Sequence, residues 1–361
     1  MADVQKKSGS KLKKILLITL CSILGVIVVA VSTVYGIFFN EANALFSIKK
    51  IDNSIYTMEY KNNYFFDEFL EEGASTDAEL IDFIVKKVLR GLPIEIGLPN
   101  FGCSGFTANT PDGDQLFGRN YDFDHSPILI TKTYPKNGYN SIATTDLKSL
   151  GFTLDHLPDS LMNKFLLIAA PYVPFDGINE KGVAMSVNMV HGPATAQNTG
   201  KISITTTTMI RMVLDKADSV ESAIALIEKY DLNDSTGGPF HYQIADKSGD
   251  SAIIEYIGDE LKITRKTGDY LAMTNFLVYN DGEFNDHYGQ DRYDTIINKL
   301  NDTGAVLTEQ EARELLEAAK IPNPLSPIPS GTMWSNVFNL DKLTMTFSPY
   351  QDFSKKIVFR F

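Results

Sequence analysis

An uncharged apolar run over residues 15–39 constrains this chain more than any other feature. The run reads ILLITLCSILGVIVVAVSTVYGIFF, and a helix of about 20 residues is enough to cross a bilayer. Five lysines precede it, at positions 6, 7, 11, 13 and 14, and positive flanks remain on the cytoplasmic side. We therefore expect residues 1–39 to form a cytoplasmic tail and a single-pass signal anchor at the cell membrane, with everything beyond on the extracytoplasmic side.

A cleaved signal peptide is the alternative for the same run, and it would give a secreted protein. Its apolar region would span only about 7–15 residues and end in a small-residue cleavage site. The stretch around residues 30–32 is a weak candidate for such a site. Cys21 fits a lipoprotein cleavage site poorly because the bulky Leu20 precedes it, so the uncleaved anchor is favoured.

Charge and composition exclude several classes of protein. The formal net charge is -12, which argues against nucleic acid as a partner because phosphate binding needs a basic face. Two cysteines cannot form a disulfide scaffold or a zinc site, and the five histidines are scattered along the chain. We therefore expect no metal site and no cofactor, and composition leaves the oligomeric state open, a homo-oligomer included.

The ectodomain reads as an α+β arrangement of stacked sheets covered by helices. Thr76 and Glu79 form a capping box that predicts one amphipathic helix over residues 76–90, and residues 40–63 show no clear period. Strand-like runs follow from residue 103, then a helical pattern over 203–230, a hairpin over 240–257, helices near 290–300 and 308–320, and final strands. We divide the chain into an anchor (1–39), a propeptide or spacer (40–102) and one catalytic domain (103–361).

Cys103 is the only cysteine outside the apolar run. Gly102 precedes it and Ser104-Gly105 follow, while Arg119 and Asp122 stand downstream in the segment GRNYD. An arginine near a thiol favours the nucleophilic thiolate, although a free cysteine is also commonly a small buried core residue. No histidine has a surrounding motif that marks it as the catalytic base.

One chemistry needs no histidine. If the chain is cut between Gly102 and Cys103, the new α-amino group can act as the base for the cysteine's own thiol. The pKa of an α-amine is near 7.7–8.0, close to working pH, as suits a general base.

Five sequence blocks together resemble the choloylglycine hydrolase-like, linear-amide branch of the N-terminal nucleophile hydrolases. This branch includes bile-salt hydrolases, penicillin V acylases and acid ceramidase. The blocks span residues 103–348, and in chain order they are Cys103 with Asp112-Gly113 and Gly118–Asp122, the segment NEKG at 179–182 leading to Asn188, the hairpin at 242–249, Thr274-Asn275, and GQDRY at 289–293.

The resemblance implies the four-layer αββα sandwich of N-terminal nucleophile hydrolases and an autoproteolytic cut that frees Cys103 as nucleophile. Asp122 would hold the freed amine, and Arg119 would stabilise the thiolate and face the substrate. Asn188 and Asn275 would donate hydrogen bonds to the oxyanion, and Arg292 would complete the electrostatics of the site.

The implied substrate is a small molecule with a linear amide and a bulky apolar part: a conjugated bile salt, a penicillin V-like compound, or an N-acyl lipid or amino acid. Two departures stand out. The segment 40–102 must be removed to expose Cys103, and Tyr121 stands where the family more often has methionine. Two other functions stay open, a thiol peptidase or transpeptidase that pairs Cys103 with a histidine, and a catalytically inactive binding ectodomain displayed on the membrane.

Overall fold

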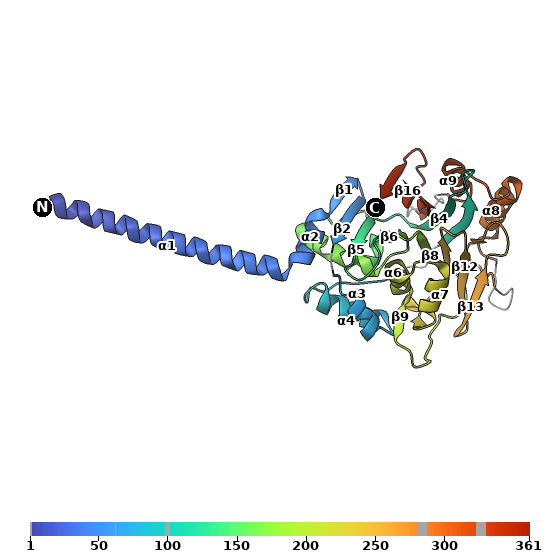
Figure 1. Cartoon of the computed structure of the whole chain (residues 1–361), viewed down its shortest axis with the longest axis horizontal. Coiled ribbons are helices and arrows are strands. Elements are labelled where there is room, and N and C mark those ends of the chain that lie inside the picture. Colours follow the sequence, from blue (N-terminus) through green and yellow to red (C-terminus); the bar gives the residue numbers. More distant parts are fainter. Residues whose placement is uncertain (1, 62, 98–101, 280–286, 323–329) are drawn as a thin grey trace.

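A long N-terminal helix leads into a body of two sheets (Figure 1). The computed structural model describes all residues except 1, 62, 98–101, 280–286 and 323–329. Helix α1 (Ala2–Ile37) projects from the body. Its segment Lys14–Thr33 has a mean hydropathy of 2.9 and is not buried against the rest of the chain. By length and composition this segment can cross a membrane, and a signal sequence would have the same character.

The body is built on one large and one smaller sheet. The large sheet has, in spatial order, β1 (Lys49–Asp52), β2 (Ile55–Lys61), β5 (Ile128–Tyr134), β6 (Ser141–Asp146), β7 (Asp176–Asn179), β8 (Val183–Met189), β11 (Phe240–Asp246), β12 (Ser251–Ile257) and β13 (Glu260–Arg265). The smaller sheet has β14 (Ala272–Met273), β3 (Gly102–Asn109), β4 (Gln115–Asp124), β15 (Ser330–Asn339), β16 (Thr344–Pro349) and β17 (Ile357–Arg360). A separate parallel pair joins β9 (Ser203–Thr205) and β10 (Asp231–Asn233).

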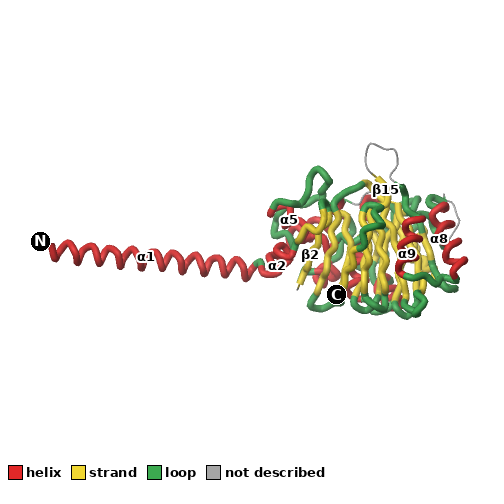
Figure 2. The backbone as a smooth tube through the Cα atoms, turned by 90° about the horizontal axis from the view of Figure 1, so that it is seen from above, coloured by secondary structure: helices red, strands yellow, loops and turns green. Residues whose placement is uncertain are grey.

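Helices cover the outer faces of both sheets. Helices α6 (Thr206–Lys216) and α7 (Val220–Ile227) pack on β7, β8 and β11 of the large sheet. Helices α8 (Gln290–Thr303) and α9 (Glu309–Ala318) pack on β3, β4, β14 and β15 of the smaller one, and Figure 2 shows both at the end of the body away from α1. The order helix–sheet–sheet–helix confirms the predicted α+β sandwich. Shorter elements are α5 (Leu161–Leu166) and the 3₁₀ turns Leu147–Leu150, Leu167–Tyr172 and Ser235–Gly237.

Thr76 caps the helix that follows it as predicted, but the predicted capping box is not completed, because the Glu79 carboxylate accepts a hydrogen bond of 2.7 Å from the Ser75 amide and not from that of Thr76. The Thr76 hydroxyl accepts a hydrogen bond of 3.2 Å from the Glu79 amide at the start of α4 (Asp77–Lys87). Thr308 and Glu311 form the complete capping box at the start of α9: the Glu311 amide donates to the Thr308 hydroxyl at 3.2 Å, and the Thr308 amide donates to the Glu311 carboxylate at 2.8 Å. These bonds satisfy amide groups that have no partner within the helix.

Residues 40–102 are more ordered than the sequence analysis expects. Besides α4, the segment contains β1, β2, α3 (Phe66–Glu72) and most of α2 (Phe39–Ser47). Strand β2 pairs in parallel with β5, from Ile55 opposite Ile128 to Lys61 opposite Tyr134. Buried Tyr56, Met58 and Tyr60 alternate in β2 with the less buried Thr57, Glu59 and Lys61, so this strand has the period of two that the expectation for residues 40–63 overlooks.

An aromatic cluster ties this segment to the rest of the body. The ring of Phe69 contacts those of Phe66 and Phe83, and all three contact Tyr172, which lies beyond the proposed cut. Aromatic pairs at such distances stabilise beyond the area they bury.

We predict that Phe69→Ala lowers the free energy of unfolding by about 3–5 kcal/mol, because it leaves a cavity in this cluster. Phe46→Ala is the control, since Phe46 is 74% exposed and its loss should cost less than about 0.5 kcal/mol. Chemical unfolding of the full chain in detergent measures both. Equal costs for the two variants would contradict the packing described above.

Candidate active site

Cys103 lies near the start of β3, between the two sheets. Strand β3 pairs with β4 so that Cys103 is opposite Tyr121 and Gly102 is opposite Asp122. Strand β3 also contacts β8 of the large sheet. The thiol is therefore fully buried in the uncut chain.

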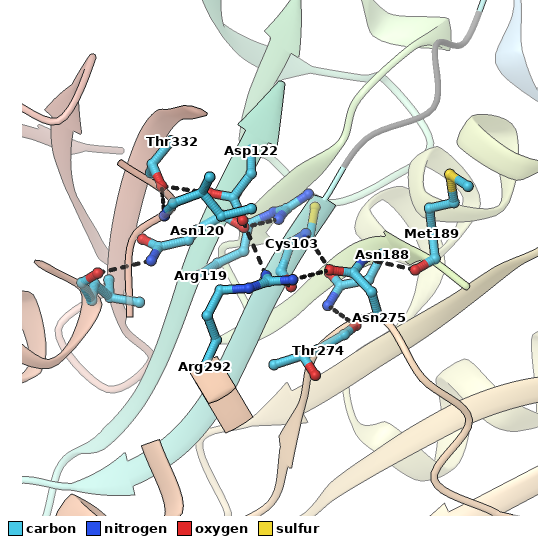
Figure 3. Close-up of polar contacts among 12 residues, drawn as sticks. Cys103, Arg119, Asn120, Asp122, Asn188, Met189, Thr274, Asn275, Arg292 and Thr332 are labelled. Carbon is cyan, nitrogen blue, oxygen red and sulfur yellow. Dashed lines mark hydrogen bonds and ion pairs between the residues drawn. The ribbon is translucent and has the colours of Figure 1, made fainter. Parts of the chain in front are cut away.

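Two side chains hold the backbone of Cys103 (Figure 3). Its amide donates a hydrogen bond of 2.9 Å to Asn275 Oδ1, and its carbonyl accepts one of 2.6 Å from Arg292 Nη1. The other terminal nitrogen of Arg292 donates to the same Asn275 oxygen at 2.7 Å. Asn275 and Arg292 thus fix the nitrogen that a cut before Cys103 would free.

Asp122 completes this arrangement from β4. Its carboxylate lies 3.2 Å from Arg292 Nη1 and accepts a 2.5 Å hydrogen bond from the Thr332 hydroxyl. Burial raises the pKa of Asp122, while Arg292 and Thr332 oppose that shift. The site therefore keeps a desolvated carboxylate beside a guanidinium.

The position of Arg292 depends on a glycine. Gly289 caps the start of α8 with φ +85°, in the left-handed region that other residues rarely adopt. A Cβ on Gly289 would lie 2.5 Å from Arg292 Nη2. The short motif GQDRY therefore matters structurally at both its glycine and its arginine.

Arg119 is fully buried and bridges the two sheets. Its Nη2 donates to the Val187 carbonyl in β8 at 2.8 Å, and its Nε lies 2.8 Å from the Asp176 carboxylate in β7. Its guanidinium also lies over the Tyr121 ring, 5.2 Å from the centroid. Asp176 therefore balances the charge that Arg119 brings into the interior.

The electrostatics keep the thiol protonated in the uncut chain. Burial raises the pKa of Cys103 to about 11, the Arg119 guanidinium opposes this rise, and the Asp122 carboxylate adds to it. A thiol attacks as the thiolate, so Cys103 must give up this proton as its sulfur attacks.

Each of the two asparagines predicted to serve the oxyanion donates a hydrogen bond to the backbone next to the other asparagine. Asn188 Nδ2 donates to the Thr274 carbonyl at 2.9 Å, and Asn275 Nδ2 donates to the Met189 carbonyl at 2.7 Å. A side-chain amide carries two hydrogens, so each uses one of them here. Asn275 also presents its oxygen to Cys103, a contact that the sequence analysis does not anticipate.

All six residues singled out from the sequence are buried, and they lie together at this point between the sheets: Cys103, Arg119, Asp122, Asn188, Asn275 and Arg292. Thr332 and Asp176 also belong to the site but are not predicted from the sequence. An acidic residue three positions before the NEKG block could have indicated Asp176, whereas Thr332 meets Asp122 only through the pairing of β15 with β4. Among the described residues, no group of three or more His, Cys, Asp or Glu side chains could hold a metal ion.

The two-sheet sandwich is the fold of the N-terminal nucleophile hydrolases, and the buried Cys103 lies between its sheets. The chain belongs to the linear amide C-N hydrolases, choloylglycine hydrolase family, whose model matches residues 103–308.

Known relatives agree with this membership. A stretch of 111 residues is 32% identical to a penicillin V acylase of Pectobacterium atrosepticum, and it covers 28% of this chain and 29% of that relative. Two variant crystal structures of conjugated bile acid hydrolase from Clostridium perfringens superpose with TM-scores of 0.51 and 0.52, at 14% and 16% identity. Each superposition covers 72% of this chain and 92% of that chain, and it supports the fold.

We predict that Thr332→Val lowers the free energy of unfolding by about 1–3 kcal/mol, because it removes the hydroxyl donor from a buried carboxylate. Thr332→Ser keeps the hydroxyl and should recover most of that loss. Chemical unfolding at neutral pH compares the two. A serine variant as unstable as the valine variant would show that the threonine methyl group matters, and not the hydrogen bond.

Proposed function

We propose that this protein hydrolyses the linear carbon–nitrogen amide bond of an N-acyl substrate, with Cys103 as an N-terminal nucleophile. The observation that carries the proposal is the set of hydrogen bonds that holds the backbone of Cys103. Asn275 holds its nitrogen, Arg292 holds its carbonyl, and Asp122 lies against the same guanidinium. These contacts suit a residue whose freed amine must stay in place as a base.

The first step is a cut between Gly102 and Cys103. The Cys103 sulfur attacks the Gly102 carbonyl, the C–N bond breaks, and the thiol proton passes to the leaving nitrogen, which becomes the α-amine. Water then hydrolyses the thioester and releases the Gly102 carboxylate. Glycine suits this position because a Cβ would lie 3.3 Å from Asp122 Cβ and 3.2 Å from Ile321 Cδ1.

In the cut enzyme the α-amine takes the thiol proton as the sulfur attacks the substrate amide. Arg119 lies where it can stabilise the thiolate. The remaining N–H groups of Asn188 and Asn275 serve the oxyanion, and one such donor is typically worth about 10²–10³ in rate. The protonated amine then gives its proton to the leaving amine, and water hydrolyses the acyl-enzyme.

The substrate classes that fit best are conjugated bile salts, penicillin V-like compounds and N-acyl lipids or amino acids. The names of the two relatives above support the first two classes. An anchor beside a bilayer supports the third. A panel with one compound of each class, assayed for amine release, identifies the substrate.

Two other functions make different predictions. An inactive binding ectodomain would stay uncut and release no amine from any compound in the panel. A thiol peptidase would act without the cut and lose activity when one histidine is replaced. The contacts of Cys103 described above involve asparagine, arginine and aspartate, which favours the amidase.

We predict that Cys103→Ala leaves a full-length, inactive chain, and that Cys103→Ser is inactive or cut slowly, because neither has the thiol. Intact mass and N-terminal sequencing of the purified protein follow the cut, and amine release follows activity. The Cys21→Ser variant, which changes the other cysteine, should be cut and active like the wild type. A wild-type chain that hydrolyses amides while uncut would disprove the proposed mechanism.

We also propose that α1 is a single-pass anchor with a cytoplasmic N-terminus, and that residues up to 102 stay bound after the cut. Strand β2 pairs with β5 along its whole length. The Tyr64 hydroxyl donates to the buried Asp215 at 2.6 Å, and the Tyr172 hydroxyl donates to the Tyr64 carbonyl at 2.7 Å. These contacts cross the cut and join the anchor to the catalytic domain.

We predict that residues 103–361 remain in the membrane fraction and co-purify with the anchored fragment. Denaturant should separate the two fragments, because only noncovalent contacts hold them. Fractionation of cells followed by immunoblotting of each fragment measures this. Recovery of all the cut enzyme in the medium would overturn the proposed retention.

A further inference from the structure

A row of three buried side chains crosses three neighbouring strands of the large sheet. Asn188 on β8 is directly opposite His241 on β11. The register of β11 with β12, with Tyr242 opposite Ile254, brings Glu255 beside His241. All three side chains are fully buried. Asn188 belongs to the proposed site, whereas His241 and Glu255 have no part in the mechanism above.

The row binds one backbone segment, residues 274–279, which we call the Asn275 segment. The Thr274 carbonyl accepts hydrogen bonds of 2.9 Å from both Asn188 Nδ2 and His241 Nε2. The two oxygens of Glu255 accept the amides of Val278 and Tyr279, each at 2.7 Å. The row therefore holds the segment at both ends.

The hydrogen-bonding roles of the two His241 ring nitrogens follow from their partners. A carbonyl can only accept, so Nε2 must carry a hydrogen toward Thr274. The other ring nitrogen lies 2.9 Å from Glu255 Oε1, and a proton must lie between these two acceptor-type atoms for a hydrogen bond to form. Glu255 thus sets the orientation of the ring that holds Thr274, as a carboxylate does for many functional histidines.

The held segment carries the residue that meets Cys103. Asn275 follows Thr274 directly, and its oxygen accepts from the Cys103 amide and from Arg292. A displacement of about 1 Å in a catalytic contact can cost about 10²-fold in rate. Any displacement of Thr274 would therefore also displace Asn275 from the Cys103 nitrogen.

We propose that His241 and Glu255 are positioning residues, which hold the Asn275 segment so that Asn275 meets the nitrogen of Cys103. They act through Thr274, Val278 and Tyr279 and do not contact the reacting atoms. The role rests on the function proposed above for Asn188 and Asn275. It adds two side chains to that function, although neither lies in the blocks that hold the nucleophile or its charged partners.

The test compares variants of the full chain in detergent. His241→Met removes the donor to Thr274 and leaves Glu255 without its partner. His241→Gln keeps an amide that can donate in its place, and the double variant His241→Gln/Glu255→Gln keeps the row polar without a charge, in case the methionine variant does not fold. The readouts are the rate of the cut, kcat and KM measured separately, and the melting temperature.

Gln243→Met is the matched control. Gln243 is also buried on β11, two residues beyond His241, and its amide holds the Leu271 carbonyl at 3.0 Å, outside the Asn275 segment. This variant should lose stability without a matching loss of kcat.

We expect His241→Met to lower kcat and the rate of the cut by about 10- to 100-fold with KM changed less than about threefold, and His241→Gln to restore most of the loss. The double variant should lower kcat as well, because Glu255→Gln leaves one acceptor oxygen for the two amides of Val278 and Tyr279. The proposal is overturned if a folded His241→Met or double variant retains wild-type kcat, if KM alone changes, or if Gln243→Met loses as much kcat.

A second readout does not depend on turnover. In the uncut Cys103→Ala chain, hydrogen exchange should be slow at the amides of residues 103, 278 and 279, and His241→Met or the double variant should speed exchange at all three. Unchanged exchange would refute the positioning role even if the protein had no amidase activity. A wild type that neither cuts nor hydrolyses, with exchange responding as expected, would refute the proposed function alone.

Discussion

The site depends on the burial of two guanidinium groups, and everything around it compensates for that burial. Arg119 and Arg292 lie between or against the sheets, where an unpaired charge would cost several kcal/mol. Asp176 pairs with the first and Asp122 with the second. Strand β4 supplies Arg119 and Asp122 three residues apart, so its register against β3 and β15 decides whether either pair forms.

The same charges bear on both reactions proposed for this site. In the uncut chain the Cys103 nitrogen is an amide and can only donate, and the thiol is protonated because burial raises its pKa to about 11. A cut would replace that amide with an amine, whose pKa near 7.7–8.0 lets it take the thiol proton at working pH. Asn275 already points an acceptor oxygen at this nitrogen, so the amine would be held without any rearrangement.

The sequence predicts those parts of the site that lie in continuous motifs. Cys103, Arg119 and Asp122 fall within 20 residues, and this short spacing is enough to assign them to one site. Thr332 and the pair His241–Glu255 could not be predicted in the same way, because each acts on a backbone or carboxylate that only strand register brings near. The hairpin over 240–257 is predicted correctly, but its buried polar face depends on which residues meet β8. Strand β2 is not predicted, although Tyr56, Met58 and Tyr60 alternate there with polar residues at a period of two.

The segment before Cys103 also covers an edge of the large sheet that would otherwise be unpaired. Strand β5 pairs with β6 on one side and with β2 on the other. Without β2, the seven residues of β5 would present an open edge of amides and carbonyls, which favours aggregation. Loss of the aromatic residues that follow β2 would also leave Tyr172 without these ring partners. The proposed cut at Gly102 would break one peptide bond and none of these contacts, so β1 and β2, which complete this side of the sheet, would also join the proposed catalytic domain to the proposed anchor.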